Sequence, residues 1–290
     1  MKLLNGKDLS EYIKQRQAQE VRSLKQAHGL NPKLAIIQVK DDPVINTYVR
    51  LKKRYGDDIG VEVASFHPEQ AEVGQVIGEL NSDDSIHGII VQLPLTDTSD
   101  TDRVVDLVVP EKDVDALGSL ATLDPATPMA IMWLLAGYNI ELKGKKVLLI
   151  GRGKLVGAPL ERIYKDSGVD VTVADRSTKD LKELTLEADV IITATGSPAI
   201  LYPEMVKPGV VIVDAGVASE DGKTVGDVAP EMFNIDDITI TPVKGGVGPL
   251  TVCALFENVI RATKVSAKQA HYGKQCIRLV SLTQGSVVSP

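Results

Sequence analysis

Aromatic side chains are scarce in this chain, where three Phe, seven Tyr and one Trp make up 4% of 290 residues. A core with so few rings must be built from Val, Ile, Leu and Ala, which favours buried parallel strands over a sandwich or a barrel. Hydrophobic residues account for 43% of the chain and charged ones for 24%. That balance is typical of a soluble globular protein with one large domain or two of ordinary size.

Cysteine is scarcer still, and long apolar segments are missing from the sequence. Cys253 and Cys276 lie in no CxxC motif and no Cys/His cluster, which argues against a metal site and more strongly against a disulfide framework. The N-terminus turns polar within a few residues, unlike a signal peptide, and no apolar run approaches the length that spans a bilayer. We therefore expect a cytoplasmic protein with no bound metal and no membrane partner.

Basic residues are outnumbered, with 32 Lys and Arg against 39 Asp and Glu, a formal net charge of −7. Such a chain is repelled by phosphate backbones and anionic lipid surfaces, although a local basic pocket remains compatible with this balance. We therefore expect no nucleic-acid partner.

Short apolar segments alternate with amphipathic ones along the first half of the chain, the pattern of a parallel α/β layer. The spacing predicts helices over Lys7–His28, Asn46–Gly56 and Ala71–Leu80, and strands over Leu34–Val39, Val61–Phe66 and Gly88–Val91.

A second alternation begins after Gly144. It predicts strands over Lys146–Ile150, Val171–Ala174, Val190–Thr193, Val210–Asp214 and Ile238–Thr241, with helices over Val156–Asp166 and Thr178–Glu187. Further helices are expected over Pro125–Tyr138, with Pro128 in the first turn, and over Thr251–Thr263. We expect an α/β protein of two lobes bridged by these last two helices, with the active site in the cleft between the lobes. The tail after Lys264 has no clear periodicity, and either packing on the first lobe or partial disorder fits it.

The turn after the strand Lys146–Ile150 has the composition of a dinucleotide site. Its sequence GRGKLVG, Gly151 to Gly157, follows a strand and precedes a helix, where glycines let the backbone approach a pyrophosphate. The spacing GxGxxxG is one residue longer than the usual fingerprint. The prediction of a dinucleotide site therefore depends on its context, which is the preceding strand, the following helix and Asp175 at the end of the next strand. The expected cofactor site comprises Gly151, Arg152, Gly153, Val156, Gly157, Asp175, Arg176, Thr195, Gly196 and Val217.

The choice between NAD and NADP remains open on these residues. Asp175 suits a ribose with a free 2′-hydroxyl, whereas Arg152 and Arg176 suit a 2′-phosphate. Both arginines are equally compatible with plain surface charge.

Polar residues in the first half form a second constellation. Tyr48 and Lys52 share one face of the helix Asn46–Gly56, because they are four residues apart. Gln92 follows the strand Gly88–Val91, and Asp115 closes the segment PEKDVD. Ligands of open α/β sheets bind beyond the carboxyl ends of the strands, where Gln92 falls. The glycine-rich loop TPVKGGVGPLT, residues 241–251, is expected there too.

These motifs make the chain similar to a known family. YxxxK, VQLPL, PEKDVD, the glycine turn, GDV (Gly226–Val228) and the glycine-rich loop occur in the order found in the bifunctional methylenetetrahydrofolate dehydrogenase/cyclohydrolase family. The resemblance extends to about Ala262. It implies a folate-binding lobe, 1–125 completed by 252–290, and a Rossmann-like NAD(P) domain, 126–251.

The resemblance also implies roles for matching residues. Lys52 matches the catalytic lysine, Tyr48 lines or stacks on the folate, Gln92 is hydrogen-bonded to the lysine, and Asp115 binds the pterin ring. Gly246, Gly248 and Pro249 are expected to contact substrate. A tetrahydrofolate derivative is the expected partner, NADP is favoured slightly over NAD, and a homodimer is expected because the family is usually dimeric.

The chain departs from the family at several positions. Ile45 replaces a usual serine, Ala116-Leu117 replaces Gly-Phe, Ala126 a cysteine, Gly153 a serine and Lys244 a proline. The stretch between Asp115 and Pro128 is also shorter than usual. Two alternatives therefore remain: a dehydrogenase without hydrolase activity, and a catalytically silent nucleotide-binding protein. Retention of Tyr48, Lys52, Gln92 and Asp115 together argues against the silent protein.

Overall fold

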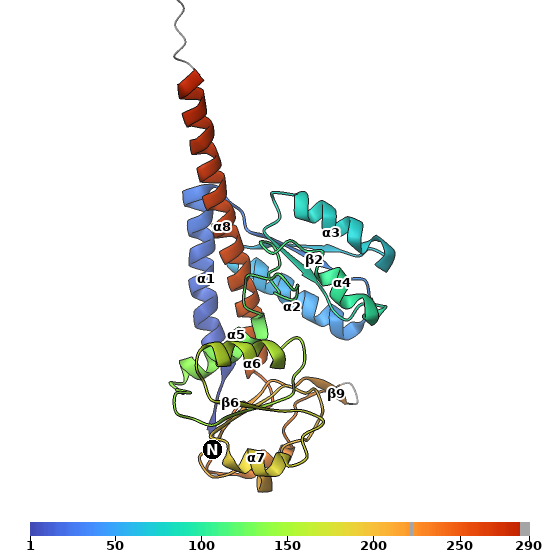
Figure 1. Cartoon of the computed structure of the whole chain (residues 1–290), viewed down its shortest axis with the longest axis vertical. Coiled ribbons are helices and arrows are strands. Elements are labelled where there is room, and N and C mark those ends of the chain that lie inside the picture. The colour runs from blue at the N-terminus through green and yellow to red at the C-terminus, as the bar shows by residue number, and fades with distance from the viewer. Residues whose placement is uncertain (221–222, 285–290) are drawn as a thin grey trace, which may run out of the picture. The chain divides into compact units, whose positions relative to one another are not determined.

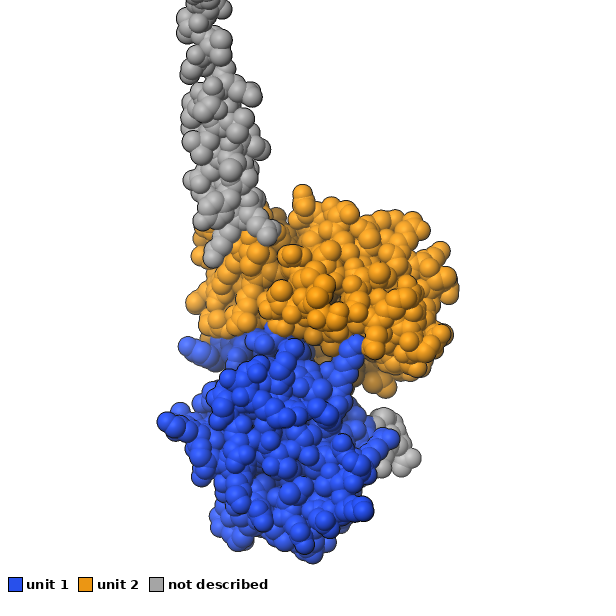
Figure 2. Space-filling model, in the orientation of Figure 1, with its two compact units in different colours: residues 1–14, 124–255 blue, residues 15–123, 256–290 orange. Residues whose placement is uncertain are grey.

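A computed structural model describes the backbone of residues 1–220 and 223–284, and the side chains of residues 1–218 and 225–267. The chain separates into two compact units, coloured in Figure 2. Unit 1 comprises Met1–Lys14 and Asp124–Leu255, and unit 2 comprises Gln15–Leu123 and Phe256–Pro290. The helices α1 (Gly6–His28) and α8 (Val247–Gln284) contribute residues to both units.

Unit 2 is built on a three-stranded parallel sheet. Its strands are β2 (Lys33–Ile37), β3 (Glu62–Phe66) and β4 (Gly88–Val91), in the order β3-β2-β4. The helices α2 (Pro43–Ile59) and α3 (Val73–Ser82) form the two crossovers. Because these crossovers run in opposite directions and parallel crossovers are right-handed, the two helices cover opposite faces of the sheet (Figure 1). The short helix α4 (Thr101–Val105) follows β4.

Unit 1 contains a six-stranded parallel sheet in the order β1-β11-β8-β7-β5-β6. Its strands are β1 (Lys2–Leu3), β5 (Val147–Ile150), β6 (Val171–Ala174), β7 (Val190–Thr193), β8 (Val211–Asp214) and β11 (Thr239–Ile240). The helices α5 (Ala126–Gly137), α6 (Gly157–Asp166) and α7 (Leu181–Glu187) pack beside it, and β9 (Ala218–Glu220) and β10 (Lys223–Val225) form a hairpin. Single 3₁₀ turns lie at Gln70–Glu72, Thr98–Asp100, Pro203–Met205 and Pro230–Asn234.

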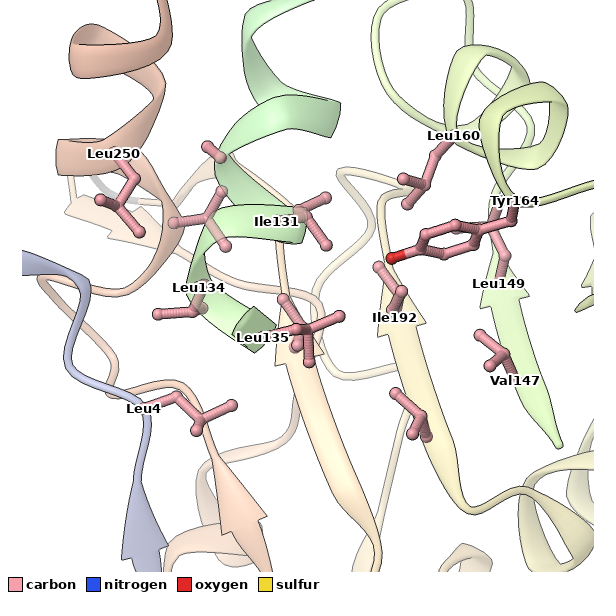
Figure 3. Packing of buried hydrophobic residues seen from close by; sticks show 14 residues of the cluster. Leu4, Ile131, Leu134, Leu135, Val147, Leu149, Leu160, Tyr164, Ile192 and Leu250 are labelled. Carbon is pink, nitrogen blue, oxygen red and sulfur yellow. The ribbon is translucent and has the colours of Figure 1, made fainter. Parts of the chain in front are cut away.

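The cores are aliphatic, as the composition predicts. Figure 3 shows one face of the unit 1 sheet, where strand residues such as Leu149 and Ile192 meet Ile131 of α5 and Leu160 of α6. Tyr164 of α6 is the aromatic residue of this cluster. Its hydroxyl is buried and has no hydrogen-bond partner within the described chain.

The α/β fold class is confirmed, and the strands β4, β6 and β7 match their predicted bounds residue for residue. The predicted bounds of the C-terminal helix were wrong. The last helix is not confined to Thr251–Thr263, because α8 begins at Val247 and continues through the tail to Gln284. Residues 285–290 of that tail lie outside the described part of the chain.

The N-terminus adds an edge strand that no alternation predicted. The Lys2 and Leu4 amides donate to the Ile238 and Ile240 carbonyls, at 2.9 and 2.8 Å. Residues 1–14 therefore group with the second half of the chain, and α5 lies wholly in unit 1. No helix among the described residues combines the length and apolarity needed to cross a bilayer.

Candidate functional site

The glycine turn between β5 and α6 is tightly packed at both ends. A Cβ on Gly151, whose φ is +103°, would lie 2.5 Å from the Ala194 carbonyl oxygen. A Cβ on Gly157 would lie 2.1 Å from the Gly151 carbonyl oxygen. Gly153, between them, has no heavy atom within 4 Å of such a Cβ. The turn therefore has fixed ends and an open middle, the form that lets a backbone approach a phosphate group.

The strand order places this turn at a topological switch point. β6 lies on one side of β5 and β7 on the other, so a crevice is expected at the carboxyl ends of β5 and β7. Thr195 and Gly196 follow β7, and a Cβ on Gly196 would lie 3.3 Å from the Val217 carbonyl oxygen. The structure thus brings Thr195, Gly196 and Val217 together, with Gly151 against the same loop.

Asp175 and Arg176 follow β6, and both are exposed. The Asp175 carboxylate accepts hydrogen bonds from the Ser177 hydroxyl at 2.5 Å and the Ser177 amide at 2.8 Å. These bonds lower the pKa of Asp175, and the positive charge of Arg152 lowers it further. Arg152 itself forms an ion pair with Glu161, with Nε 2.7 Å from Oε2. Arg152 is therefore near the acid that was expected to meet a ribose, but it is already held by α6.

In unit 2 the expected polar residues come together at the corresponding switch point, beside β2 and β4. The Lys52 ammonium of α2 donates to Gln92 Oε1 at 2.7 Å, which is the hydrogen bond expected between them. Gln92 in turn donates from Nε2 to the Leu93 carbonyl at 3.1 Å, which orients its oxygen toward the lysine. Tyr48 lies one turn earlier on α2 and is 39% exposed.

Lys52 and Asp115 are coupled electrostatically. Burial lowers the pKa of Lys52, and the negative charge of Asp115 opposes that shift. Burial likewise raises the pKa of Asp115, and Lys52 opposes it. Desolvation is the larger cause in both groups, so the amine loses its proton more easily than a surface lysine does.

The loop that carries Asp115 is held by residues that sequence reasoning did not single out. The buried Asp113 carboxylate accepts from the Gly118 amide at 2.9 Å and from the Leu117 amide at 3.4 Å. Asn258 of α8 donates to the Val114 carbonyl at 2.9 Å. PEKDVD was noted as a motif, but nothing in it distinguishes the acid that closes a turn from the acid that faces a ligand.

Lys112 of the same motif stabilises the end of α3. Its ammonium donates to the carbonyls of Leu80, Asn81 and Asp83, at 3.1, 2.8 and 2.8 Å. These carbonyls lie at the end of α3, where a positive charge is favourable.

The glycine-rich loop belongs to unit 1, whereas Tyr48 and Lys52 belong to unit 2. The Lys7 amide donates to the Gly245 carbonyl at 3.0 Å, and a Cβ on Gly6 would lie 1.9 Å from the Gly246 carbonyl oxygen. Gly248 and Pro249 fall in the first turn of α8, where proline is tolerated. The loop is therefore anchored on α1, and its place beside the folate stays a prediction.

Comparison with known proteins gives one family for both halves. Residues 4–115 match the model described as tetrahydrofolate dehydrogenase/cyclohydrolase, catalytic domain. Residues 125–267 match the NAD(P)-binding domain of the same description. The bifunctional protein FolD 2 of Lactobacillus johnsonii is 39% identical over 276 residues, covering 91% of this chain and 98% of that protein.

Solved structures agree with this result. The bifunctional FolD methylenetetrahydrofolate dehydrogenase/cyclohydrolase of Campylobacter jejuni has a TM-score of 0.86 at 38% identity, covering 91% of this chain and 99% of its own. The Trypanosoma brucei methylenetetrahydrofolate dehydrogenase-cyclohydrolase, solved with NADP and an inhibitor, has a TM-score of 0.85 at 29% identity, covering 91% and 97%.

Proposed function

This chain belongs to the tetrahydrofolate dehydrogenase/cyclohydrolase family, and we propose that it oxidises 5,10-methylenetetrahydrofolate with NAD(P) and hydrolyses the methenyl product to 10-formyltetrahydrofolate. The observation that supports both steps is the amine of Lys52, held at 2.7 Å by Gln92 and coupled to Asp115. We further propose the division of labour expected from the sequence, with 1–125 and 252–290 binding folate and 126–251 binding the dinucleotide.

The oxidation needs few ionisable groups. NAD(P), which the turn Gly151–Gly157 and the loop at Thr195 would hold, would supply the acceptor for the hydride that leaves the methylene carbon as a ring nitrogen lone pair forms the methenyl cation. The chain must mainly hold the folate in place. A pterin ring presents adjacent N–H donors, and the Asp115 carboxylate can accept two of them in a fork.

The hydrolysis needs proton transfer at a cationic carbon. Water adds to this carbon and loses a proton, which Lys52 can accept or relay because burial lowers its pKa. The bond from the carbon to N5 then breaks and N5 takes up a proton, which leaves the formyl group on N10. The nearby methenyl cation would lower the pKa further.

An absorbance assay tests the proposal. Methenyl formation should require NAD(P), and added methenyltetrahydrofolate should be hydrolysed without it. Formation without hydrolysis would identify a dehydrogenase-only enzyme. Absence of both activities, with dinucleotide binding retained, would identify a silent nucleotide-binding protein.

Asp115→Ala tests the folate assignment. Each charge-assisted hydrogen bond contributes about 1.5–3 kcal/mol, so folate affinity should fall about tenfold or more and both activities should fall together. Unchanged folate affinity by calorimetry would refute the pterin role.

We propose NADP as the preferred dinucleotide. Arg176 is exposed beyond β6, and Arg152 lies near enough to lower the pKa of Asp175, so positive charge is available for a 2′-phosphate. Arg176→Ala should raise the KM for NADP and leave NAD almost unchanged. If NAD is the cofactor, Asp175→Ser should instead raise NADP activity and reduce NAD activity. An unchanged NAD/NADP ratio in both variants would place the adenosine end elsewhere.

We also propose a cytoplasmic homodimer whose product supplies one-carbon units for purine biosynthesis. Family resemblance supports the dimer, and the acidic net charge of −7 supports a partner set without nucleic acid or membrane. Light scattering coupled to size-exclusion chromatography checks the mass, and a monomer at working concentration contradicts the dimer.

A further inference from the structure

Two acids in unit 1, one partly buried and one buried, have no part in the proposed chemistry. Asp214 ends β8, and Asp227 follows the hairpin β9-β10 as the central residue of the GDV motif. Asp227 is completely buried. Neither carboxylate forms an ion pair with any described residue. Buried carboxylates without a cation must be stabilised by hydrogen bonds, so their donors indicate what they hold.

The donors to Asp214 come from the end of β7, from the residues after β8 and from the GDV segment. Oδ1 accepts from the Thr193 hydroxyl at 3.1 Å, the Gly216 amide at 2.9 Å and the Asp227 amide at 3.1 Å. Oδ2 accepts from the Val228 amide at 3.1 Å. Asp214 therefore ties the ends of β7 and β8 to the segment that contains the second acid.

Asp227 holds the loop that follows β7. Its Oδ2 accepts from the Thr195 amide at 2.7 Å, and its Oδ1 accepts from the Ser197 amide at 3.0 Å. Its own carbonyl accepts from the Ile200 amide at 2.8 Å. Asp227 therefore fixes three amides of this loop, those of Thr195 and Ser197 on either side of Gly196 and that of Ile200 farther along.

The packing around the two carboxylates leaves no room for side chains. A Cβ on Gly226 would lie 2.0 Å from Asp214 Oδ2, and a Cβ on Gly216 would lie 2.0 Å from Asp227 Oδ1. Gly216 directly precedes Val217, an expected cofactor residue. The acids and glycines therefore form one interlocked unit beneath Thr195, Gly196 and Val217.

We propose that Asp214 and Asp227 are positioning residues for the dinucleotide, acting by setting the backbone of residues 194–197 and 215–217. This inference rests on the proposed function, because it takes the dinucleotide to bind at these loops. The effect extends to the pyrophosphate turn, since a Cβ on Gly151 would lie 2.5 Å from the Ala194 carbonyl oxygen. A shift of the loop after β7 therefore cannot occur without a change at Gly151.

Asp227→Asn tests the proposal with little change of shape. The amide can accept from one of Thr195 and Ser197, but it turns an N–H donor toward the other, and two donors repel. Loss of one hydrogen bond to a charged group corresponds to about tenfold or more in affinity. We expect the Kd for NADPH, from its fluorescence in a direct titration, to rise by that factor. The KM for NADP should rise more than kcat at saturating NADP falls.

Asp189→Asn is the matched control. Asp189 also caps an amide of unit 1, accepting from the Lys146 amide at 2.9 Å and from the Lys207 ammonium at 2.8 Å, but it precedes β7 at the amino edge of the sheet. The control should lower Tm without changing the Kd for NADPH. A purely architectural role for Asp227 would make the two variants behave alike.

Thr193→Val provides a milder variant if Asp227→Asn does not fold. It removes one hydroxyl donor to Asp214 at nearly constant volume, and the Kd for NADPH should rise about threefold. If Asp227→Asn folds and binds NADPH with wild-type affinity, the positioning role is overturned. If Asp227→Asn is insoluble, wild-type NADPH affinity in Thr193→Val overturns it. If the wild-type chain binds neither NADPH nor NADH, the proposed function itself fails, before any variant is compared.

Discussion

The two units place their candidate residues by the same topological rule but build their sites from different material. In each sheet one strand has the next two strands of the chain on either side of it, β3 and β4 around β2 in unit 2, and β6 and β7 around β5 in unit 1. The unit 2 site consists of side chains that hold one another, Lys52, Gln92 and Asp115. The unit 1 site consists mainly of backbone, shaped by glycines and held by the hydrogen bonds of the Asp214 and Asp227 carboxylates.

This difference indicates where each unit is vulnerable. A site of coupled side chains loses its chemistry when one of them is replaced, even if the fold is unchanged. A site of shaped backbone has few side chains to lose, and it fails when something displaces the backbone. Substitutions that separate these two kinds of failure test the comparison.

The largest effect is expected for Lys52→Met. Proton transfer by a positioned group contributes about 10²–10⁴-fold, so hydrolysis of methenyltetrahydrofolate should fall by at least a hundredfold. Hydride transfer should fall less, because it needs no proton at the bridge carbon. Lys53→Met, at the next position of α2, is the control. Hydrolysis at the wild-type rate in Lys52→Met would exclude the lysine as the relay.

Gly157→Ala should have the next largest effect, in the other unit. Its Cβ would lie 2.1 Å from the Gly151 carbonyl oxygen, so the turn must move. Overpacking of this kind costs about 1–3 kcal/mol, and NADPH affinity should fall about tenfold or more. Gly153→Ala adds a Cβ that meets no protein atom within 4 Å, so the ligand-free chain should keep its Tm in this variant and lose Tm in Gly157→Ala. Equal losses of Tm in the two ligand-free variants would mean that packing of the turn is unimportant.

The sequence predicted the central strands of the sheets better than the edge strand β1 and the end of α8. β4, β6 and β7 are apolar runs with polar ends, so composition alone marks their limits. β1 has two residues and joins the sheet only through a partner more than 230 positions away, which no local pattern encodes. The end of α8 escaped prediction because the residues after Lys264 have no apolar period.

The site shows the same division. The family resemblance implied the pairing of Lys52 with Gln92, and the hydrogen bond between them is present. The roles of Asp214 and Asp227 could not be predicted, because their partners are amides, which every residue carries. Two glycines, Gly216 and Gly226, were the available signal, but a glycine does not reveal which atom presses against it.

Locally unfavourable residues occur in both units. In unit 1, Tyr164 buries a hydroxyl that has no partner among the described residues. Tyr164→Phe should therefore raise the free energy of unfolding by about 1–3 kcal/mol. Tyr138→Phe is the opposite case, since that hydroxyl accepts from the Asn5 amide at 2.8 Å, and it should destabilise by about 1 kcal/mol. Denaturant titration measures both, and a destabilised Tyr164→Phe contradicts the prediction.

In unit 2, Ala116 adopts a left-handed conformation, with φ +55°. A left-handed backbone costs a non-glycine residue about 1–2 kcal/mol. Glycine avoids that cost, but its greater flexibility in the unfolded chain offsets about 0.5–1 kcal/mol of the gain. Ala116→Gly should therefore stabilise the fold by up to about 1 kcal/mol in thermal unfolding. Ala136→Gly, on the exposed side of α5, should destabilise it instead.

The smallest expected change is a shift of the Lys52 pKa in Asp115→Asn. The Asp115 charge raises that pKa against the effect of burial, so its removal should lower the pKa further. The neutral amine would then form at lower pH, and the rising limb of the hydrolysis profile should move the same way. A ¹³C titration of labelled lysine measures the shift, with the exposed Glu111→Gln as control. An upward shift would show that Asp115 does not act on Lys52 as a charge.

The residues of the segment PEKDVD are under different selection, some for the stability of the fold and one for the proposed activity. Lys112 holds the end of α3 and Asp113 closes the turn, whereas Asp115 is the one proposed to meet a ligand. Selection for a stable fold therefore preserves most of the motif even where selection for turnover has ended. A descendant that has lost its reaction would keep the recognisable letters of this motif for a long time, and within the motif only drift at position 115 would record the loss.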